Sequence, residues 1–250
     1  PYHTFFKFYN EHNWPYNEFY DGWWGHDTLP KLNYEGSEKL MEDIMRIGAK
    51  WVSPPFNADG WRLDVADELP GDFIEGIRSA IDAEKPGAYL LGEVWEDGSN
   101  KVAYSQRRRY LLGSETHGLM NYPFRTAALD WLRGGDAACF RDTMETIREH
   151  YPRPAFYSAL NILGTHDTPR ILTLLGAEHV PDTKDARAAY RLSPEERQKG
   201  EARLRVGEML LYCFPGSPTV YYGDEAGMEG FEDPLNRKTC LLYTSPSPRD

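Results

Sequence analysis

The sequence predicts an α/β fold with a parallel sheet, and within that class it favours part of an α/β barrel. Apolar strand-like segments alternate along the chain with amphipathic helical segments, which is the order that produces a parallel sheet. The strand-like segments are short and apolar on both faces, as strands covered on both sides must be. Charged residues follow where these strands end, the positions from which barrels build their active sites; they are Asp64, Glu93, Asp167 and Asp224.

The first regular element that the pattern predicts is a helix. Ser37 is a typical N-cap residue, and Leu40, Ile44 and Ile47 then repeat at the spacing of one helical face. We expect Gly48 to end this helix.

The other elements continue the alternation. Ser193-Pro194-Glu195-Glu196 reads as a capping box with proline in the first turn, so a helix is expected from there to about residue 213. The remaining segments are expected to be strands at 60–66, 88–95, 118–124, 158–167 and 217–225, and helices at 72–83, 125–133 and 137–149.

Three parts of the chain are expected. Residues 1–36 are dense in aromatic rings without a clean period, so they predict a long ordered loop or small subdomain on the catalytic face. Residues 37–239 are expected to form the barrel part. The tail at 240–250, "CLLYTSPSPRD", resembles a translated sequencing adapter and is left out of the fold prediction, a genuine flexible tail being the alternative.

Charge and composition narrow the class of partner. The 250 residues include 28 Lys+Arg and 39 Asp+Glu, for a net charge of −11. Nucleic acids and anionic membranes bind basic surfaces, so neither is predicted as a partner. No apolar run approaches the roughly 18 residues of a membrane span. A neutral ligand fits better, and the 14% of aromatic residues suits stacking on sugars, although such rings also simply fill a core.

The cysteines and the first residues of the chain bear on the cellular compartment of the protein. Cys139, Cys213 and Cys240 match neither a metal pattern nor a disulfide framework, so free thiols and a cytoplasmic location are favoured. The chain starts at Pro1 without an initiator Met or a signal peptide, so we expect further residues upstream. The oligomeric state has no signature in the sequence.

An arginine and an aspartate lie two residues apart in the strand "GWRLDVA". Strand periodicity is two, so Arg62 and Asp64 point to the same side. A neighbouring cation lowers the pKa of a carboxylate, and an aspartate kept ionised in this way is a candidate nucleophile. A purely structural ion pair is the alternative.

A second carboxylate, Glu93, follows one strand–helix repeat later in "LLGEVW". Its apolar and aromatic surroundings are expected to raise its pKa, so that it carries a proton and acts as a general acid. Two carboxylates in opposite environments are what the cleavage of a glycosidic bond requires. The alternative for Glu93 alone is a solvated loop residue.

A third carboxylate, Asp167, follows His166 near the end of a later strand. Asp167 could favour the charge that develops in the transition state, and His166 could donate a hydrogen bond to the same sugar. Alternatively Asp167 is a helix N-cap, since Thr168-Pro169 resembles a helix start. For two other charged groups, His26-Asp27 and Arg107-Arg108-Arg109, we expect a plain loop and a solvated face.

At these residues the sequence resembles glycoside hydrolase family 13, the α-amylase family. "GWRLDVA" resembles the second family signature, "LLGEVW" the third and "GTHDTPR" the fourth, while "PTVYYGDEAGM" is similar to the last barrel strand. The segments occur in the family's order and span residues 29–239. "GEVW", "MNYPF" and "HDTPR" are most similar to the neopullulanase, cyclomaltodextrinase and maltogenic amylase branch.

The resemblance implies a TIM (β/α)8 barrel and residue roles. Asp64 would be the nucleophile, Glu93 the general acid/base and Asp167 the transition-state stabiliser. Arg62, His166, Trp95 and Arg170 would contact substrate or its charge partners. The implied reaction is retaining hydrolysis of α-1,4-glucosidic bonds in starch, pullulan, cyclodextrin or maltooligosaccharides. No cofactor or metal is implied by the residues, which carry no signature for or against calcium.

The sequence also departs from the family pattern. The family's Asp-x-Val-x-Asn-His signature is missing, so the strands are expected to be strands 4–8 of a partial barrel, with strands 1–3 missing. Branch members show Asn-Glu where this chain has Asp67-Glu68, which puts subsite specificity in doubt. Because open sheet edges would face water, we expect this fragment alone to be inactive or to aggregate.

Two other functions are compatible with the same residues. A transglycosylase would use the same site to make new glucosidic bonds. A non-catalytic carbohydrate-binding or scaffold barrel is the alternative outside catalysis, although such members usually lose a carboxylate and this chain keeps all three.

Overall fold

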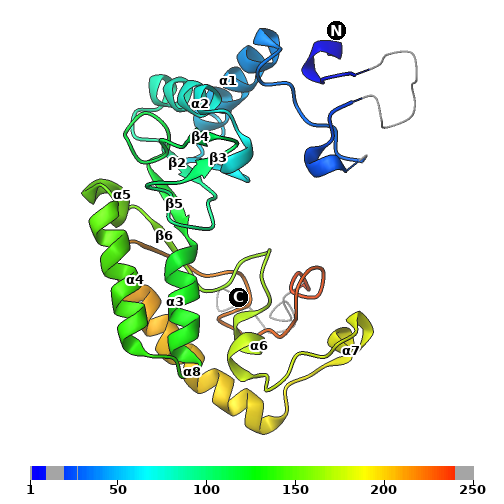
Figure 1. Cartoon of the computed structure of the whole chain (residues 1–250), viewed down its shortest axis with the longest axis vertical. Coiled ribbons are helices and arrows are strands. Elements are labelled where there is room, and N and C mark those ends of the chain that lie inside the picture. Colours follow the sequence, from blue (N-terminus) through cyan, green and yellow to red (C-terminus); the bar gives the residue numbers. More distant parts are fainter. Residues whose placement is uncertain (1, 10–19, 27, 240–250) are drawn as a thin grey trace. The chain divides into compact units, whose positions relative to one another are not determined.

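The computed structural model describes residues 2–9, 20–26 and 28–239, and the chain divides into two compact units (Figure 1). The first unit holds the chain up to Glu93 together with Asn100–His117, and the second holds Val94–Ser99 together with the chain from Gly118 onward. The tail at 240–250 and Asp27 lie outside the described residues, so the expectations for them stay predictions.

The first unit contains a parallel strand pair. Strand β1 (Gly60–Leu63) pairs with β2 (Tyr89–Gly92), with Arg62 opposite Leu91. The predicted strands were longer. Both observed strands end at the residue directly before a carboxylate. A short antiparallel hairpin of β3 (Val102–Ala103) and β4 (Gln106–Arg107), which we did not predict, completes the unit's strands among the described residues.

Two helices of the first unit pack against each other. Helix α1 (Glu38–Val52) starts at the predicted cap, where the Ser37 side chain accepts a hydrogen bond from the amide of Leu40. Helix α2 (Gly71–Glu84) matches its predicted range to within one residue at each end. Gly48 was expected to end α1, which is wrong, because Gly48 is a packing residue. A Cβ there would lie 3.0 Å from Ile77 of α2, so a glycine lets the helices approach.

The described part of the aromatic N-terminal segment is folded rather than extended. It holds 3-10 turns at His3–Phe5 and Trp23–Gly25. Isolated antiparallel bridges join Phe6 to Leu32, Phe8 to Tyr20 and Gly22 to Pro30. These bridges fit an ordered loop or small subdomain.

Among its described residues, the second unit contains three parallel strands and most of the helices. Strand β6 (Leu160–Ile162) pairs with β5 (Gly118–Asn121) and with β7 (Ser217–Thr219). The predicted parallel pairing is therefore confirmed. The helices are α3 (Tyr122–Leu132), α4 (Ala137–His150), α5 (Arg153–Tyr157), α6 (Ile171–Gly176), α7 (Lys184–Ala189) and α8 (Pro194–Cys213).

Local capping decides several boundaries of the second unit. The strand predicted at 118–124 stops at Asn121, whose side chain accepts from the Phe124 amide and starts α3. The capping box of α8 is present as predicted: Ser193 Oγ accepts from the Glu196 amide, and the Glu196 carboxylate accepts from the Ser193 amide. None of the described helices has the length and apolarity that crossing a bilayer demands.

Candidate active site

The register of the first unit brings the two predicted catalytic carboxylates together. Arg62 lies opposite Leu91 in the parallel pair, so Asp64 and Glu93, each two residues further on, reach the same level. The backbone confirms this level, because the Glu93 amide donates to the Leu63 carbonyl at 3.0 Å. Both carboxylates directly follow the last residue of a strand, as predicted.

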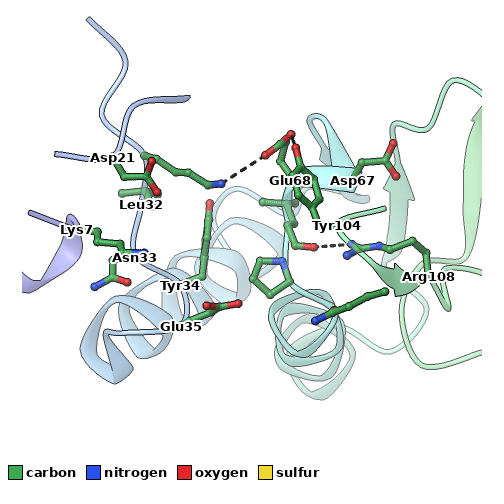
Figure 2. A pocket seen from close by; sticks show the side chains of 14 residues that line it. Lys7, Asp21, Leu32, Asn33, Tyr34, Glu35, Asp67, Glu68, Tyr104 and Arg108 are labelled. Atoms are coloured by element: carbon green, nitrogen blue, oxygen red, sulfur yellow. Dashed lines mark hydrogen bonds and ion pairs between the residues drawn. The ribbon is translucent and has the colours of Figure 1, made fainter. Parts of the chain in front are cut away.

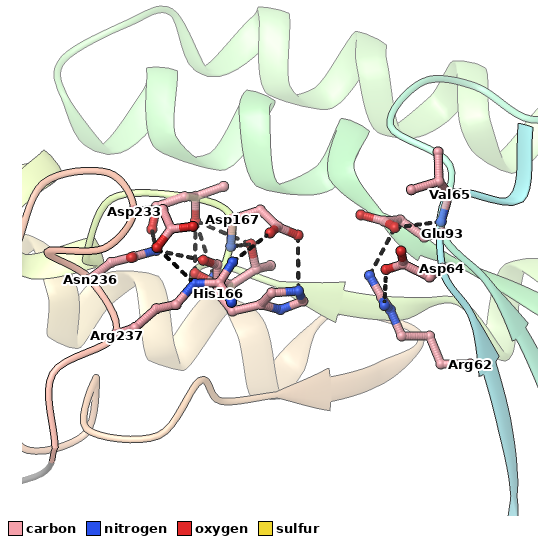
Figure 3. Close-up of polar contacts among 11 residues, drawn as sticks. Arg62, Asp64, Val65, Glu93, His166, Asp167, Asp233, Asn236 and Arg237 are labelled. Atoms are coloured by element: carbon pink, nitrogen blue, oxygen red, sulfur yellow. Dashed lines mark hydrogen bonds and ion pairs between the residues drawn. The ribbon is translucent and has the colours of Figure 1, made fainter. Parts of the chain in front are cut away.

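One guanidinium contacts both carboxylates (Figure 3). Arg62 Nη1 lies 2.6 Å from Asp64 Oδ1, and Arg62 Nη2 lies 2.9 Å from Glu93 Oε2. We predicted the first contact and missed the second. The second contact depends on the register, because only the pairing of Arg62 with Leu91 places Glu93 beside the same guanidinium. The two carboxylates therefore share one face and one counter-charge.

The two carboxylates have different surroundings. The Asp64 side chain is 69% exposed, whereas the Glu93 side chain is 4% exposed. Glu93 Oε2 also accepts a hydrogen bond from the amide of Val65 at 2.8 Å. An exposed carboxylate, Asp64, thus lies next to a buried one, Glu93, which Arg62 and the Val65 amide hold in place. This asymmetry suits a nucleophile that must reach a substrate atom and a proton donor with a fixed orientation.

Val65 adopts an uncommon backbone conformation directly after Asp64. Its φ and ψ are 43° and 61°, in the left-handed region. A β-branched residue is strained there, by roughly 1–3 kcal/mol. In this conformation the Val65 amide donates to the Glu93 carboxylate, so the residue after Asp64 holds Glu93 in place.

Asp167 and His166 lie together in the second unit. His166 Nε2 lies 3.2 Å from Asp167 Oδ2, and Arg237 Nη2 lies 3.3 Å from Asp167 Oδ1 (Figure 3). Asn236 Nδ2 donates to the carbonyl of His166 at 2.7 Å and to that of Thr168 at 2.8 Å. We did not predict Asn236 and Arg237 from the sequence, because they come from a segment without strand or helix pattern.

The alternative interpretation of Asp167 as a helix N-cap is wrong. Helix α6 begins at Ile171, and its N-cap is Arg170. Thr165 and Thr168 instead form a local turn, in which the Asp167 amide donates to Thr165 Oγ1 at 3.2 Å. The Asp167 side chain is consequently 30% exposed and faces a cation rather than a helix end.

Arg170, predicted as a substrate-binding residue, is buried in the second unit and 1% exposed. Its Nη1 lies 3.1 Å from Asp224 Oδ1 and also donates to the Tyr222 carbonyl, while its guanidinium lies over the Tyr221 and Tyr222 rings. Burial raises the pKa of Asp224 to about 6, even though the hydrogen bond and charge of Arg170 lower it. The contacts of Arg170 are therefore with the protein.

Trp95 presents a ring surface in the second unit. It is 48% exposed, and its other face stacks on Tyr122 with ring centroids 4.2 Å apart and an angle of 12°. A fixed, exposed indole is a suitable platform for a sugar ring.

No group of three or more His, Cys, Asp or Glu side chains within residues 2–9, 20–26 and 28–239 is arranged to hold a metal ion.

The loop that carries Trp95 is tied to helix α4 by Asp97, and this tie predicts a pH effect. Asp97 Oδ2 lies 2.5 Å from His150 Nδ1, and Asp97 Oδ1 accepts from Ser99. Burial raises the pKa of Asp97, but these hydrogen bonds outweigh it and the net pKa is lowered. A lowered carboxyl pKa adds stability above the unfolded pKa, and this stability is lost as the pH falls through the folded pKa.

Asp97→Asn is therefore expected to lower the free energy of unfolding by about 1 kcal/mol at pH 7. The difference from the unaltered protein should shrink below about pH 4. Urea denaturation at pH 3, 5 and 7 measures it, with the exposed Asp142→Asn as the matched control. A difference that is constant with pH would contradict the role of the Asp97 carboxylate.

Comparisons with known proteins identify the family of the chain. The family model "Alpha amylase, catalytic domain" matches residues 3–244. Amylopullulanase of Thermoanaerobacter thermohydrosulfuricus is 38% identical over 88% of this chain and 16% of its own length. Cyclomaltodextrinase of Geobacillus thermopakistaniensis is 34% identical over 86% of this chain and 31% of its own. A solved structure of a Nostoc punctiforme debranching enzyme superposes with a TM-score of 0.76, at 28% identity over 97% of this chain and 48% of that one. The chain thus spans less than half of each of these proteins.

Proposed function

This chain belongs to the α-amylase family of glycoside hydrolases, and we propose that it carries the catalytic carboxylates of an enzyme that hydrolyses α-1,4-glucosidic bonds with retention of configuration. The names of its relatives, amylopullulanase and cyclomaltodextrinase, support α-glucans such as pullulan, cyclodextrins and maltooligosaccharides as substrates. The observation that carries the proposal is the single Arg62 guanidinium bound to an exposed and a buried carboxylate at neighbouring strand ends.

In the first step, the Asp64 carboxylate attacks the anomeric carbon of the sugar. A bond forms between that carbon and the aspartate oxygen as the glycosidic bond breaks, and Glu93 gives its proton to the leaving oxygen. In the second step, Glu93 takes a proton from water, the water oxygen attacks the anomeric carbon, and Asp64 leaves as a carboxylate. Two inversions at one carbon give net retention.

Other residues fit supporting roles in this reaction. Asp167 presents a partly exposed carboxylate that can stabilise the positive charge of the transition state, with His166 beside it as a hydrogen-bond donor. Trp95 has an exposed ring surface on which a sugar ring can stack. Arg170 supports the framework through Asp224 rather than contacting the substrate.

We propose that the five strands that form parallel pairs, β1, β2, β5, β6 and β7, correspond to strands 4–8 of the family's barrel. The order of the site residues along the chain supports this assignment, because the nucleophile follows β1, the acid follows β2 and the third carboxylate follows β6. The assignment also agrees with the share of the solved relative that the chain covers, 48%.

Product stereochemistry tests the proposal. The full-length protein is incubated with maltotriose or a cyclodextrin, and the first products are followed by proton NMR before mutarotation. The α-anomer is expected to appear first, whereas an initial β-anomer would exclude double displacement. Chromatography of the same reactions distinguishes hydrolysis from transfer, because products longer than the substrate would show a transglycosylase.

A further inference from the structure

The turn that follows Asp64 is held from behind by a buried arginine, Arg108, for which the proposed reaction has no role. Residues Ala66–Glu68 form a single 3-10 turn, and Leu69 follows it. The Arg108 side chain is 6% exposed. Its Nη2 donates to the Ala66 carbonyl at 3.0 Å and to the Leu69 carbonyl at 2.5 Å. Figure 2 shows Arg108 reaching towards the turn that carries Asp67 and Glu68. Arg108 therefore binds the turn at both ends.

A second set of contacts fastens the middle of the same turn. The Tyr110 hydroxyl accepts from Arg108 Nε at 2.9 Å and donates to Asp67 Oδ1 at 2.6 Å. Burial and then the Asp67 hydrogen bond raise the pKa of Tyr110, so the hydroxyl keeps the proton that it donates. Lys101 forms an ion pair with the other Asp67 oxygen. Arg108, Tyr110 and Lys101 all belong to the segment around the β3–β4 hairpin, which thus clamps the turn.

The clamped turn is also bonded to Glu93. The Ala66 carbonyl faces Arg108, while the Ala66 amide donates to the Glu93 carbonyl at 3.1 Å. The Val65 amide donates to the Glu93 carboxylate, in the strained left-handed conformation described above. A strained residue keeps its conformation only where its neighbours hold it. Arg108 holds the residue next to Val65.

We propose that Arg108 is a positioning residue that fixes the Asp64–Glu93 pair through the 66–69 turn. This inference rests on the proposed function, since it assigns Arg108 to the same reaction. The arrangement also corrects the expectation of a solvated face at Arg107–Arg109. Arg107 and Arg109 are exposed, but Arg108, which directly follows β4, is buried and binds the turn.

Variants of Arg108 and Tyr110 in the full-length protein test the clamp. Arg108→Met keeps the volume and removes every donor, and Arg108→Lys keeps the charge without the forked donors. Tyr110→Phe removes only the hydroxyl, so it serves if Arg108→Met does not fold. Arg107→Met, in the exposed neighbour whose Nη2 binds Asn100, is the matched control.

Two readouts are measured on each variant. Hydrogen exchange of peptides that cover residues 64–69 is expected to become roughly tenfold faster or more in Arg108→Met, because the turn loses its buried donors. The kcat for maltotriose per folded molecule is expected to fall roughly 10- to 100-fold while KM changes less than about threefold, because misplaced catalytic groups slow the chemical step. Arg108→Lys and Tyr110→Phe should show smaller changes in the same direction, and Arg107→Met neither.

The outcomes separate the clamp from the reaction. Unchanged exchange in Arg108→Lys and Tyr110→Phe would overturn the clamp, whatever the substrate is. Faster exchange with an unchanged kcat per folded molecule would show a merely structural role and overturn the positioning. If the full-length protein cleaves no glucan, the proposed function is overturned, and with it the positioning role of Arg108 in that reaction. The hydrogen-exchange data would still show whether Arg108 holds the turn.

Discussion

Asp64→Asn is expected to lower kcat on maltooligosaccharides by roughly 10⁴-fold or more, the largest effect of any single substitution in this chain. The amide of Asn is a poor nucleophile, so no covalent glycosyl intermediate can form. A substrate with an activated leaving group, α-glucosyl fluoride, should give no recovery, because in the proposed mechanism the missing group is the one that attacks carbon. Steady-state kinetics with both substrates measures the effect.

Glu93→Gln is the matched control for this prediction, because it also replaces a carboxylate with an amide. We expect a loss of roughly 10²- to 10⁴-fold on maltooligosaccharides, from the absent proton donor. α-Glucosyl fluoride needs little protonation to lose fluoride, so its first step should be much less affected. If α-glucosyl fluoride restores the activity of Asp64→Asn instead of Glu93→Gln, Glu93 is the nucleophile and Asp64 the acid. Near-normal activity of either variant on maltooligosaccharides would contradict the mechanism.

Arg170→Met is expected to lower the free energy of unfolding by about 3–5 kcal/mol, because it leaves the buried Asp224 carboxylate without its partner. Both side chains of this pair are buried, and Arg170 also binds the Tyr222 carbonyl and packs on two tyrosine rings. Urea denaturation of the full-length protein at pH 8 measures the change.

The pH dependence identifies Asp224 as the cause. A carboxyl whose folded pKa is raised destabilises the folded protein as the pH rises from its unfolded value to its folded value, about 6 for Asp224. Removal of the Arg170 cation raises the pKa of Asp224 further, so the cost of Arg170→Met should be larger at pH 8 than at pH 5. The double variant Arg170→Met/Asp224→Asn should regain part of the stability at pH 8. An equal cost at both pH values would contradict this explanation.

Local patterns in the sequence predict much of the fold. The capping residues Ser37 and Ser193 mark helix starts, and apolar runs mark β2, β5 and β6. The observed β7 instead lies before the apolar run that predicted it. The strands end earlier than predicted, because apolar residues continue past the last ladder hydrogen bond: β6 stops at Ile162 although the apolar run reaches Leu163. The β3–β4 hairpin has two-residue strands without hydrophobic alternation, so its pattern gave no sign of it.

The site shows the same division between local and long-range information. Strand periodicity places Arg62 and Asp64 on one side, and repeat spacing places Glu93 on the next strand. The second half of the Arg62 contact depends on register, which the sequence predicts only when strand ends are known. The left-handed Val65 and the buried Arg108 depend on contacts between residues far apart in the chain, such as Arg108 with Ala66. Charge alone made Arg108 look like a solvated residue.

The central claim is that Asp64 is the nucleophile of the pair that Arg62 holds. Trapping of the covalent intermediate tests this most directly. The full-length protein is treated with a 5-fluoro-α-glucosyl fluoride, digested, and mapped by mass spectrometry. We predict one added fluoroglucosyl group, located on the peptide that contains Asp64 and absent from the Asp64→Asn variant. A label on Glu93 or Asp167, or turnover of glucan through an unlabelled enzyme, would contradict the account.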